Sequence, residues 1–222
     1  MCGRFTQAKP GEVVAELFGL AEVPSLAPRY NIAPTQDVAA VRARADGGRE
    51  IALLHWGLVP SWAKDRAIGA RMINARAETA AEKPAFRAAL RARRCLVVAD
   101  GFYEWQRLGS RKQPFYIAFR DGRAFGFAGL WETWRGAGGE GLDSCAILTT
   151  TPNDVVAPVH DRMPVIVPPE AYGEWLAPDE RDPARLLPLL APHPAGEMHA
   201  FPVSLRVNNP ANDDASCVAG LR

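Results

Sequence analysis

The sequence predicts a single α+β domain over residues 1–222, with a mainly antiparallel, curved and barrel-like sheet and a few short helices. About nine short apolar runs are separated by turn signals, and only a few segments have helix spacing. No internal repeat or long linker divides the chain. With 222 residues, of which 48% are hydrophobic, the chain can bury one full core.

The first half predicts one helix and one hairpin. Residues 12–20 carry apolar side chains at helix spacing, and Gly19 can end that helix. Residues 38–44 and 50–58 lie on either side of Asp46-Gly47-Gly48, which predicts two paired strands. Between these elements, residues 30–34 are expected to form a loop.

The middle of the chain predicts a helix, a strand and a second hairpin. Residues 83–93 are interpreted as a short helix, and residues 94–105 as one continuous strand. Residues 115–119 and 124–131 are joined by Asp121-Gly122, a dipeptide typical of tight hairpins. The remaining elements follow in order: a flexible loop at 136–141, strands at 145–150 and 162–167, helices at 170–176 and 183–190, and a strand at 200–205.

Composition and charge exclude several classes of protein. The formal net charge is +1, so any nucleic-acid site must be a local basic patch. No segment has the pattern of a signal peptide or a membrane span. The four cysteines form no CxxC pair, and Cys95 and Cys145 lie in apolar runs typical of buried reduced thiols. These features favour a cytoplasmic protein without a metal site or cofactor.

The N-terminal Met1-Cys2-Gly3-Arg4-Phe5 has unusual chemical potential. Removal of Met1 before the small Cys2 would leave one residue with both a free α-amine and a thiol. Such a group condenses with an aldehyde to an imine, and the thiol then closes a thiazolidine ring. An α-amine has a pKa of about 8, so a fraction of it is neutral at pH 7. The alternative is that Cys2 is incidental in a poorly ordered terminus.

Polar residues in otherwise apolar surroundings provide further candidates. Asn74 follows Ile73, Glu104 lies between two aromatic residues, and His160 follows Val159. Each also has a structural interpretation: Asn74 as a helix cap, Glu104 as the solvent-facing residue of a strand, and His160 as a structural histidine. No single one of these residues is specific for a function.

Together the candidates lie in motifs that resemble the SOS-response-associated peptidase (SRAP) family. The matching stretches are Cys2-Gly3-Arg4-Phe5, residues 30–34 (YNIAP), residues 56–60 (WGLVP) with Trp62, residues 73–79 (INARAET), residues 99–105 (ADGFYEW) and residues 160–164 (HDRMP). Residues 202–204 and 207–208 match more weakly. The motifs follow the family's order over residues 2 to about 170, whereas the final dozen residues carry no family signal.

The resemblance implies that the protein binds single-stranded DNA and crosslinks covalently to abasic sites through Cys2. Glu104, enclosed by aromatic side chains, would have a raised pKa and move protons during imine formation. His160 would be a second proton-transfer group, and Asn74 would hold the N-terminal residue or the sugar. The family name also implies a peptidase activity, such as removal of the chain's own first residue.

The resemblance also implies a set of DNA-binding residues. Arginines would pair with phosphates beside the lesion, and aromatic or apolar side chains would stack on or wedge between bases. The candidates are Arg4, Asn31, Pro34, Trp56, Trp62, Arg76, Arg162 and Met163. The expected partner is single-stranded DNA containing abasic sites, bound by a monomer.

Two other classes of function remain open on the sequence. Met-Cys-Gly also begins class II glutamine amidotransferases, which use an N-terminal cysteine as a nucleophile, but these usually carry a second synthase domain. The other class is a non-covalent DNA- or protein-binding module in which Cys2 has no role. A glutaminase assay tests the first, and stability of a DNA complex in hot detergent tests the second.

Overall fold

Five strands pair in a closed ring in the computed structural model, which describes residues 2–221. The ring strands are β3 (Asp37–Ala43), β4 (Arg49–Trp56), β6 (Arg94–Ala99), β9 (Phe125–Arg135) and β10 (Gly141–Thr150). Antiparallel pairs join β4 to β3, β3 to β6, β6 to β9 and β9 to β10, and a parallel pair of β10 with β4 closes the ring. This confirms the predicted α+β fold with a curved, barrel-like sheet.

Three short strands extend the ring. β5 (Asn74–Arg76) pairs in parallel with β10, β11 (Met163–Pro164) pairs antiparallel with β10, and β12 (Ile166–Val167) pairs antiparallel with β9. Residues from two motifs far apart in the sequence, in β5 and β11, thereby pair with the same strand, β10.

A second sheet has five strands in the order β13-β8-β7-β1-β2, all antiparallel. They are β1 (Phe5–Gln7), β2 (Arg29–Ile32), β7 (Gly101–Leu108), β8 (Arg111–Phe119) and β13 (Met198–Pro202). The short β1 lies between β2 and β7, so the residues just after the N-terminus are part of a sheet.

Alternating side chains of the ring strands divide the core into two clusters. On one side, residues such as Leu96 and Leu148 meet the helices. On the other side, Val97 and Ile147 meet Phe5 and Phe102 from the second sheet. The period-two alternation of strand side chains explains this division, since both faces of the ring strands are covered.

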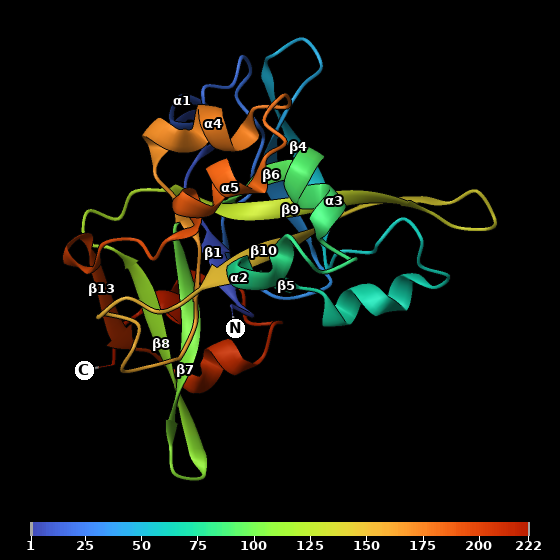
Figure 1. Cartoon of the computed structure of the whole chain (residues 1–222). Coiled ribbons are helices and arrows are strands. Elements are labelled where there is room, and N and C mark those ends of the chain that lie inside the picture. The colour runs from blue at the N-terminus through green and yellow to red at the C-terminus, as the bar shows by residue number, and fades with distance from the viewer. Residues whose placement is uncertain (1, 222) are drawn as a thin grey trace.

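The helices are short and cover the ring (Figure 1). They are α1 (Gly11–Phe18), α2 (Ala77–Ala80), α3 (Arg87–Ala92), α4 (Tyr172–Leu176) and α5 (Pro183–Leu186). Helix α1 ends at Gly19, whose φ of 63° lies in the left-handed region that glycine adopts without strain. Short 3-10 segments cover 66–71, 169–171, 187–190, 195–197, 205–208 and 215–218. No helix within residues 2–221 is long and apolar enough to cross a membrane.

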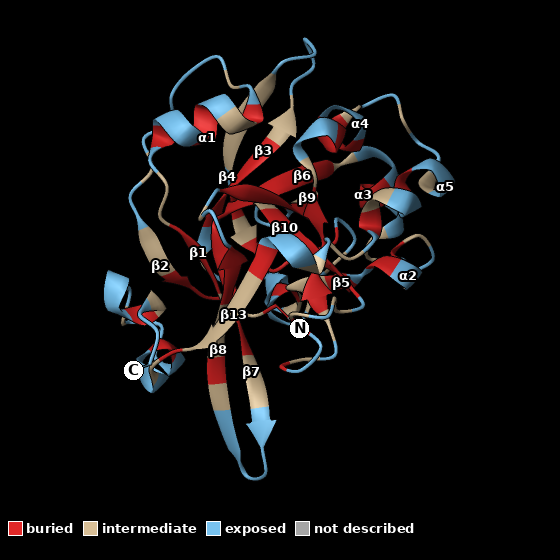
Figure 2. Cartoon of the chain, turned by 90° about the vertical axis from the view of Figure 1, so that its left-hand side faces the viewer, coloured by how far each residue is buried: buried red, intermediate tan, exposed pale blue. Residues whose placement is uncertain are grey.

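Two long hairpins project from the molecule (Figure 1). One joins β7 to β8 and has an exposed tip (Figure 2), and the other joins β9 to β10 and is exposed over residues 137–141. The predicted loop at 136–141 is the turn of the second hairpin.

The predicted hairpin of residues 115–119 with 124–131 is wrong. The turn itself exists, since Gly122 N donates to Phe119 O at 3.0 Å. However, β8 pairs with β7 and β13, whereas β9 pairs with β6, β10 and β12. The turn therefore passes the chain from one sheet to the other.

Two other local predictions are also corrected. The predicted strand 94–105 is divided at Asp100 into β6 and β7, which belong to different sheets. The predicted loop at 30–34 begins within strand β2, because Ile32 pairs with Phe5 of β1. The hairpin of β3 with β4, helix α1 and strand β10 agree with the sequence prediction within a few residues.

Candidate active site

Strand β1 fixes the N-terminal segment inside the protein. Phe5 pairs with both Ile32 and Phe102, and Tyr103 N donates to Arg4 O at 2.9 Å. Cys2 is fully buried and belongs to the same apolar cluster as Phe5. The predicted removal of Met1 concerns a residue outside those that the structure describes. The structure does not support a frayed terminus from Cys2 onward.

Asn74 holds Cys2 by its backbone. Its Nδ2 donates to Cys2 O at 2.8 Å, across 72 positions of sequence. Asn74 begins β5 and pairs with Ile147 of the central strand β10, so its position is set by the ring. Its buried Oδ1 has no hydrogen-bond partner among the described residues, which leaves an acceptor beside Cys2.

Glu104 is a buried carboxyl group on strand β7, 2% exposed. Burial raises its pKa to about 7, because an anion loses solvation there. Burial, and then the charge of Glu104, raises the pKa of the Cys2 thiol above its usual value. The thiol is therefore protonated at neutral pH, whereas Glu104 can both give and take a proton.

His160 lies next to Glu104. Its Nε2 is 3.8 Å from Glu104 Oε2, and Arg162 N donates to its Nδ1 at 3.0 Å. The Nδ1 also lies 3.1 Å from Asp161 Oδ1, so His160 is placed between two carboxyl groups, with its Nε2 facing Glu104. Burial lowers the pKa of His160, so the ring is mainly neutral at pH 7.

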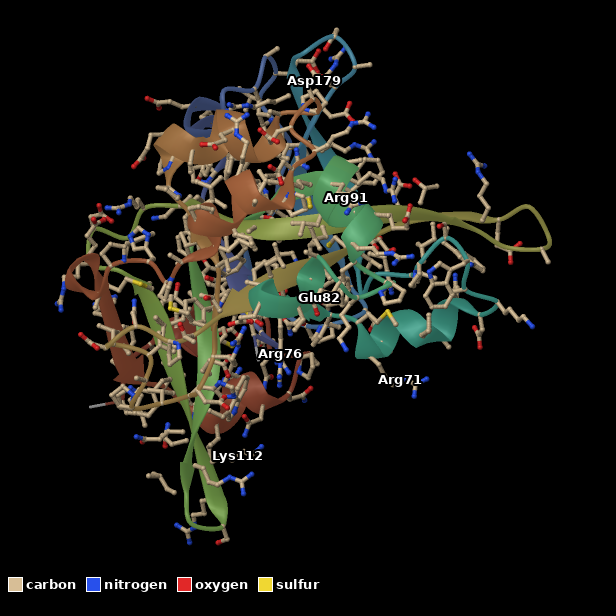
Figure 3. All side chains as sticks on the ribbon, viewed as in Figure 1. Arg71, Arg76, Glu82, Arg91, Lys112 and Asp179 are labelled. Atoms are coloured by element: carbon tan, nitrogen blue, oxygen red, sulfur yellow. The ribbon has the colours of Figure 1, made fainter. Side chains whose placement is uncertain are left out.

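The candidate arginines differ in their surroundings. Arg162 is paired with both carboxylate oxygens of Glu78 at 2.7 and 2.8 Å and also donates to Thr149 O at 2.5 Å. Arg76 ends β5 and is exposed (Figure 3). Arg162 is thus oriented within the protein, whereas Arg76 is open to a ligand.

Arg4 and Asn31 form a buried connection to the C-terminal part of the chain. Arg4 Nη1 donates to Asn31 Oδ1 at 2.7 Å and to Val207 O at 2.6 Å. Asn31 is fully buried, and its Nδ2 lies within 3.2 Å of the carbonyl oxygens of Val207, Asn209 and Asn212. Their contacts in this structure are structural, and they position the segment that follows β13.

The apolar candidates also separate by exposure. Trp56 and Met163 are fully buried, and Trp56 Nε1 donates to Ile73 O at 2.9 Å. A base cannot reach either side chain in this structure. Trp62 is 60% exposed and Pro34 is half-buried, so both can meet a ligand.

Glu78 is a site residue that the sequence reasoning did not select. It lies within the quoted motif at 73–79, four residues after Asn74, and it orients Arg162. Its acidic side chain in a motif with Arg76 is the signal that was available. Within residues 2–221, no group of three or more His, Cys, Asp or Glu is arranged to hold a metal ion.

Comparisons with known proteins identify relatives along the whole chain. A family model described as SOS response associated peptidase (SRAP) matches residues 1–210. Abasic site processing protein YoqW of Bacillus subtilis is 43% identical, over 98% of this chain and 99% of its own length. Abasic site processing protein HMCES of Xenopus tropicalis is 35% identical over 78% of this chain, which corresponds to 58% of the relative.

Solved structures have the same fold. A crystal structure of a protein from Bacteroides thetaiotaomicron has a TM-score of 0.88 at 26% identity and covers 100% of both chains. A phage-related protein from Bordetella bronchiseptica has a TM-score of 0.73 at 34% identity, over 91% of this chain and 94% of its own. The family model and the relatives cover the strands that bring Cys2, Asn74, Glu104 and His160 together, and the chain belongs to the SOS response associated peptidase (SRAP) family.

Proposed function

We propose that this protein processes abasic sites by binding single-stranded DNA and forming a covalent thiazolidine through Cys2 after Met1 is removed. The adduct shields the lesion during the response to DNA damage. One arrangement above all supports the proposal: Cys2, held by Asn74, beside a buried Glu104 whose pKa is about 7. The printed names of the relatives, which describe abasic site processing, support it independently.

The first step joins the Cys2 amine to the sugar. The opened abasic sugar has an aldehyde at C1′, and the neutral amine attacks this carbon to form a carbinolamine. Loss of water then gives an imine, and the departing hydroxide needs a proton. Glu104 is suited to supply that proton, because a carboxyl group with a pKa of about 7 is partly protonated at neutral pH.

The second step closes the ring. The Cys2 sulfur attacks the imine carbon, the thiol proton is lost and the imine nitrogen gains a proton. The sum of both steps consumes one aldehyde and one aminothiol and releases one water. Because burial keeps the thiol protonated, ring closure needs a nearby base, and the carboxylate left at Glu104 is that base.

His160 and Asn74 have supporting roles in this proposal. The Nε2 of His160 is close enough to exchange a proton with Glu104 through small movements or one water. The free Oδ1 of Asn74 is an acceptor for the new α-amine or a sugar hydroxyl. These two residues therefore orient the reacting groups and complete the proton path.

The DNA contacts are proposed at the residues that remain accessible. Arg76 pairs with phosphates beside the lesion and Trp62 stacks on a neighbouring base, whereas Arg162 is held by Glu78 and Thr149. Arg4 and Asn31 act by holding the N-terminal strand in place, and Trp56 and Met163 by forming the core beneath it. We propose that the protein acts as a monomer in the cytoplasm.

We also propose that the site removes Met1 itself, as the family name suggests. The protonatable Glu104 can assist cleavage of the bond before Cys2. Intact masses of wild type and Glu104→Gln, made by translation without methionine aminopeptidase, test this. Equal loss of methionine from both proteins contradicts self-cleavage through Glu104.

The central test is covalent adduct formation with an abasic single strand. Wild type is expected to give an adduct stable to hot detergent, with a mass that fits loss of one water. Cys2→Ala keeps the amine but lacks the thiol, so its adduct should survive only after borohydride reduction. Insertion of alanine between Met1 and Cys2 serves as the matched control, because it separates amine from thiol. A stable unreduced adduct from either variant would falsify the thiazolidine.

A further inference from the structure

The hairpin of β7 with β8 carries an exposed basic tip. It projects from the second sheet (Figure 1), and its outer residues are exposed (Figure 2). Arg107, Arg111 and Lys112 lie there, together with Leu108, which is 55% exposed. Residues 105–113 contain no acidic side chain, although the whole chain has a net charge of only +1. The tip is therefore a local patch of positive charge.

The pairing of the strands makes this tip unfavourable for the fold alone. Arg107 is directly opposite Lys112, and Leu108 is opposite Arg111. Like charges directly opposite one another destabilise a strand pair. Within residues 2–221, none of the three cations has a carboxylate partner within ion-pair distance. A negatively charged ligand would relieve this repulsion.

The tip is connected to the candidate active site. Glu104 lies on the same strand, four residues before Leu108, which corresponds to about 14 Å along β7. Gln106 Nε2 donates to Pro158 O at 2.9 Å and so fixes the hairpin to the segment that carries His160. Burial is the main cause of the lowered pKa of His160, and the charge of Lys112 makes a small further contribution. Figure 3 shows Lys112 on the hairpin and Arg76 nearer the centre of the molecule.

We propose that Arg107, Arg111 and Lys112 form a phosphate-binding arm that holds the DNA flanking the lesion on one side. The inference rests on the proposed function, because it takes the reacting C1′ to lie at Cys2 and Glu104. In a duplex the phosphates of one strand rise about 3.4 Å each along the helix axis, so about 14 Å along that axis spans roughly four nucleotides. The arm contacts phosphodiesters and reads no bases.

The test compares two triple variants with the same change in charge. The arm variant is Arg107→Gln with Arg111→Gln and Lys112→Gln. The control is Lys83→Gln with Arg87→Gln and Arg91→Gln, which removes three exposed cations from or just before α3, away from the hairpin (Figure 3). Equilibrium binding is measured from about 50 to 200 mM salt with a single strand containing a 1′-deoxy abasic analogue, which cannot crosslink.

Each lost phosphate contact on a single strand reduces the slope of log K against log salt by about 0.7, so three contacts reduce it by about 2. Over that salt range, wild type should then lose roughly 20-fold more affinity than the arm variant. The control should follow wild type. An unchanged slope for the arm variant, or an equal change in the control, overturns the proposal. Chemical unfolding checks the fold, and the arm variant should be no less stable than wild type.

The length and strandedness of the flank locate the arm's ligand. The DNA is shortened to one nucleotide on the 5′ side of the lesion in one substrate and on the 3′ side in another. Only one of these two truncations should abolish the difference in salt dependence between wild type and arm variant. A complementary strand over the long flank distinguishes duplex from single-strand phosphates. If neither truncation matters, the arm does not hold the flank.

Crosslinking with a true abasic strand at saturating concentration separates this proposal from the function itself. One outcome is that wild type forms no adduct while the arm variant still shows a weaker salt dependence of binding. That result contradicts the crosslinking proposal and supports the phosphate-binding arm. If both proteins crosslink at the same rate and bind with the same slope of log K against log salt, the phosphate-binding arm is contradicted and the crosslinking proposal stands.

Discussion

At the scale of the residue, the requirements of stability and of chemistry conflict at Glu104. Its pKa is raised from 4.5 to about 7 because the carboxylate is desolvated inside the protein. A raised carboxyl pKa means that the folded state binds a proton more tightly than the unfolded state. The resulting stability is present below the unfolded pKa and is lost as pH rises through about 7. The folded protein therefore carries an unfavourable charge at alkaline pH.

We predict that Glu104→Gln is more stable than wild type at about pH 8 and close to it at about pH 4.5. A shift of about 2.5 pKa units corresponds to about 3 kcal/mol, which is the largest gain expected. Urea midpoints of both proteins across this pH range measure the effect. The same variant should slow crosslinking by about 10² or more, because Gln cannot transfer a proton.

Glu78→Gln provides a control of opposite sign. Arg162 lowers the pKa of Glu78, so this carboxylate contributes stability above its unfolded pKa, and that stability is lost as pH falls. The control should be less stable than wild type at about pH 8. A Glu104→Gln protein that loses stability at the same pH would contradict the assigned burial effect.

We predict that Asn74→Ala slows crosslinking about five-fold while single-strand affinity is kept. The variant loses the hydrogen bond to Cys2 O, which contributes about 1 kcal/mol to holding Cys2 in its reactive position. Single-turnover adduct formation and binding to the 1′-deoxy analogue measure the two quantities. An equal loss in both would assign Asn74 to DNA binding, and Trp62→Ala, which should weaken binding alone, is the comparison.

At the scale of the element, Gly101 begins β7 at the point where the chain passes from the ring to the second sheet. It follows Asp100, which accepts hydrogen bonds from Thr6 Oγ1 and from the backbone N–H groups of Ala8 and Lys9. A Cβ at Gly101 would be 2.1 Å from Tyr116 Oη and 2.3 Å from its Cζ. The close approach of this aromatic ring therefore requires glycine at the first position of β7.

We predict that Gly101→Ala lowers the free energy of unfolding by about 2 kcal/mol or more, because the Tyr116 ring must move within a packed cluster. Gly141→Ala is the matched control, since nothing lies within 4 Å of the added atom and its φ is ordinary. The control should change stability by less than about 0.5 kcal/mol. Chemical unfolding measures both, and equal values would show that the ring has room to move.

At the scale of the whole molecule, Asn31 joins the two ends of the chain. Beyond its side-chain bonds to residues 207–212, its backbone N–H donates to Asp213 Oδ1 at 2.8 Å. The final residues, beyond the stretch that the family model matches, are thereby attached to the strand beside β1. Their contribution is to position Arg4 and the N-terminal strand.

We predict that Asn31→Ala lowers the free energy of unfolding by about 3 kcal/mol, since several buried carbonyl groups and Arg4 lose their partner. Limited proteolysis should cut after residue 204 faster than in wild type. Asn209→Ala, whose Oδ1 accepts only a local bond from Ala211 N in the described chain, is the control. Unchanged proteolysis in Asn31→Ala would show that the C-terminal segment is held by its apolar contacts instead.

The sequence by itself determined the family, the fold class and most of the strands. The continuous apolar runs in β3, β4 and β10 are a local signal, because strands covered on both faces carry apolar residues on both. The apolar run before Glu104 predicted its burial and raised pKa, and Phe102, two positions earlier on the same face of β7, belongs to the core cluster that holds Cys2.

Only the tertiary structure decided which strands pair and which candidates meet. Asp121-Gly122 forms the turn that its sequence predicts, yet the strands on either side pair with partners elsewhere, because pairing depends on the faces that the whole core must cover. Asn74 reaches Cys2, and Trp56 is buried, for the same reason: β10 closes the ring through distant partners. Local residue patterns carry strand positions, whereas contacts between distant segments arise only when the chain closes around its core.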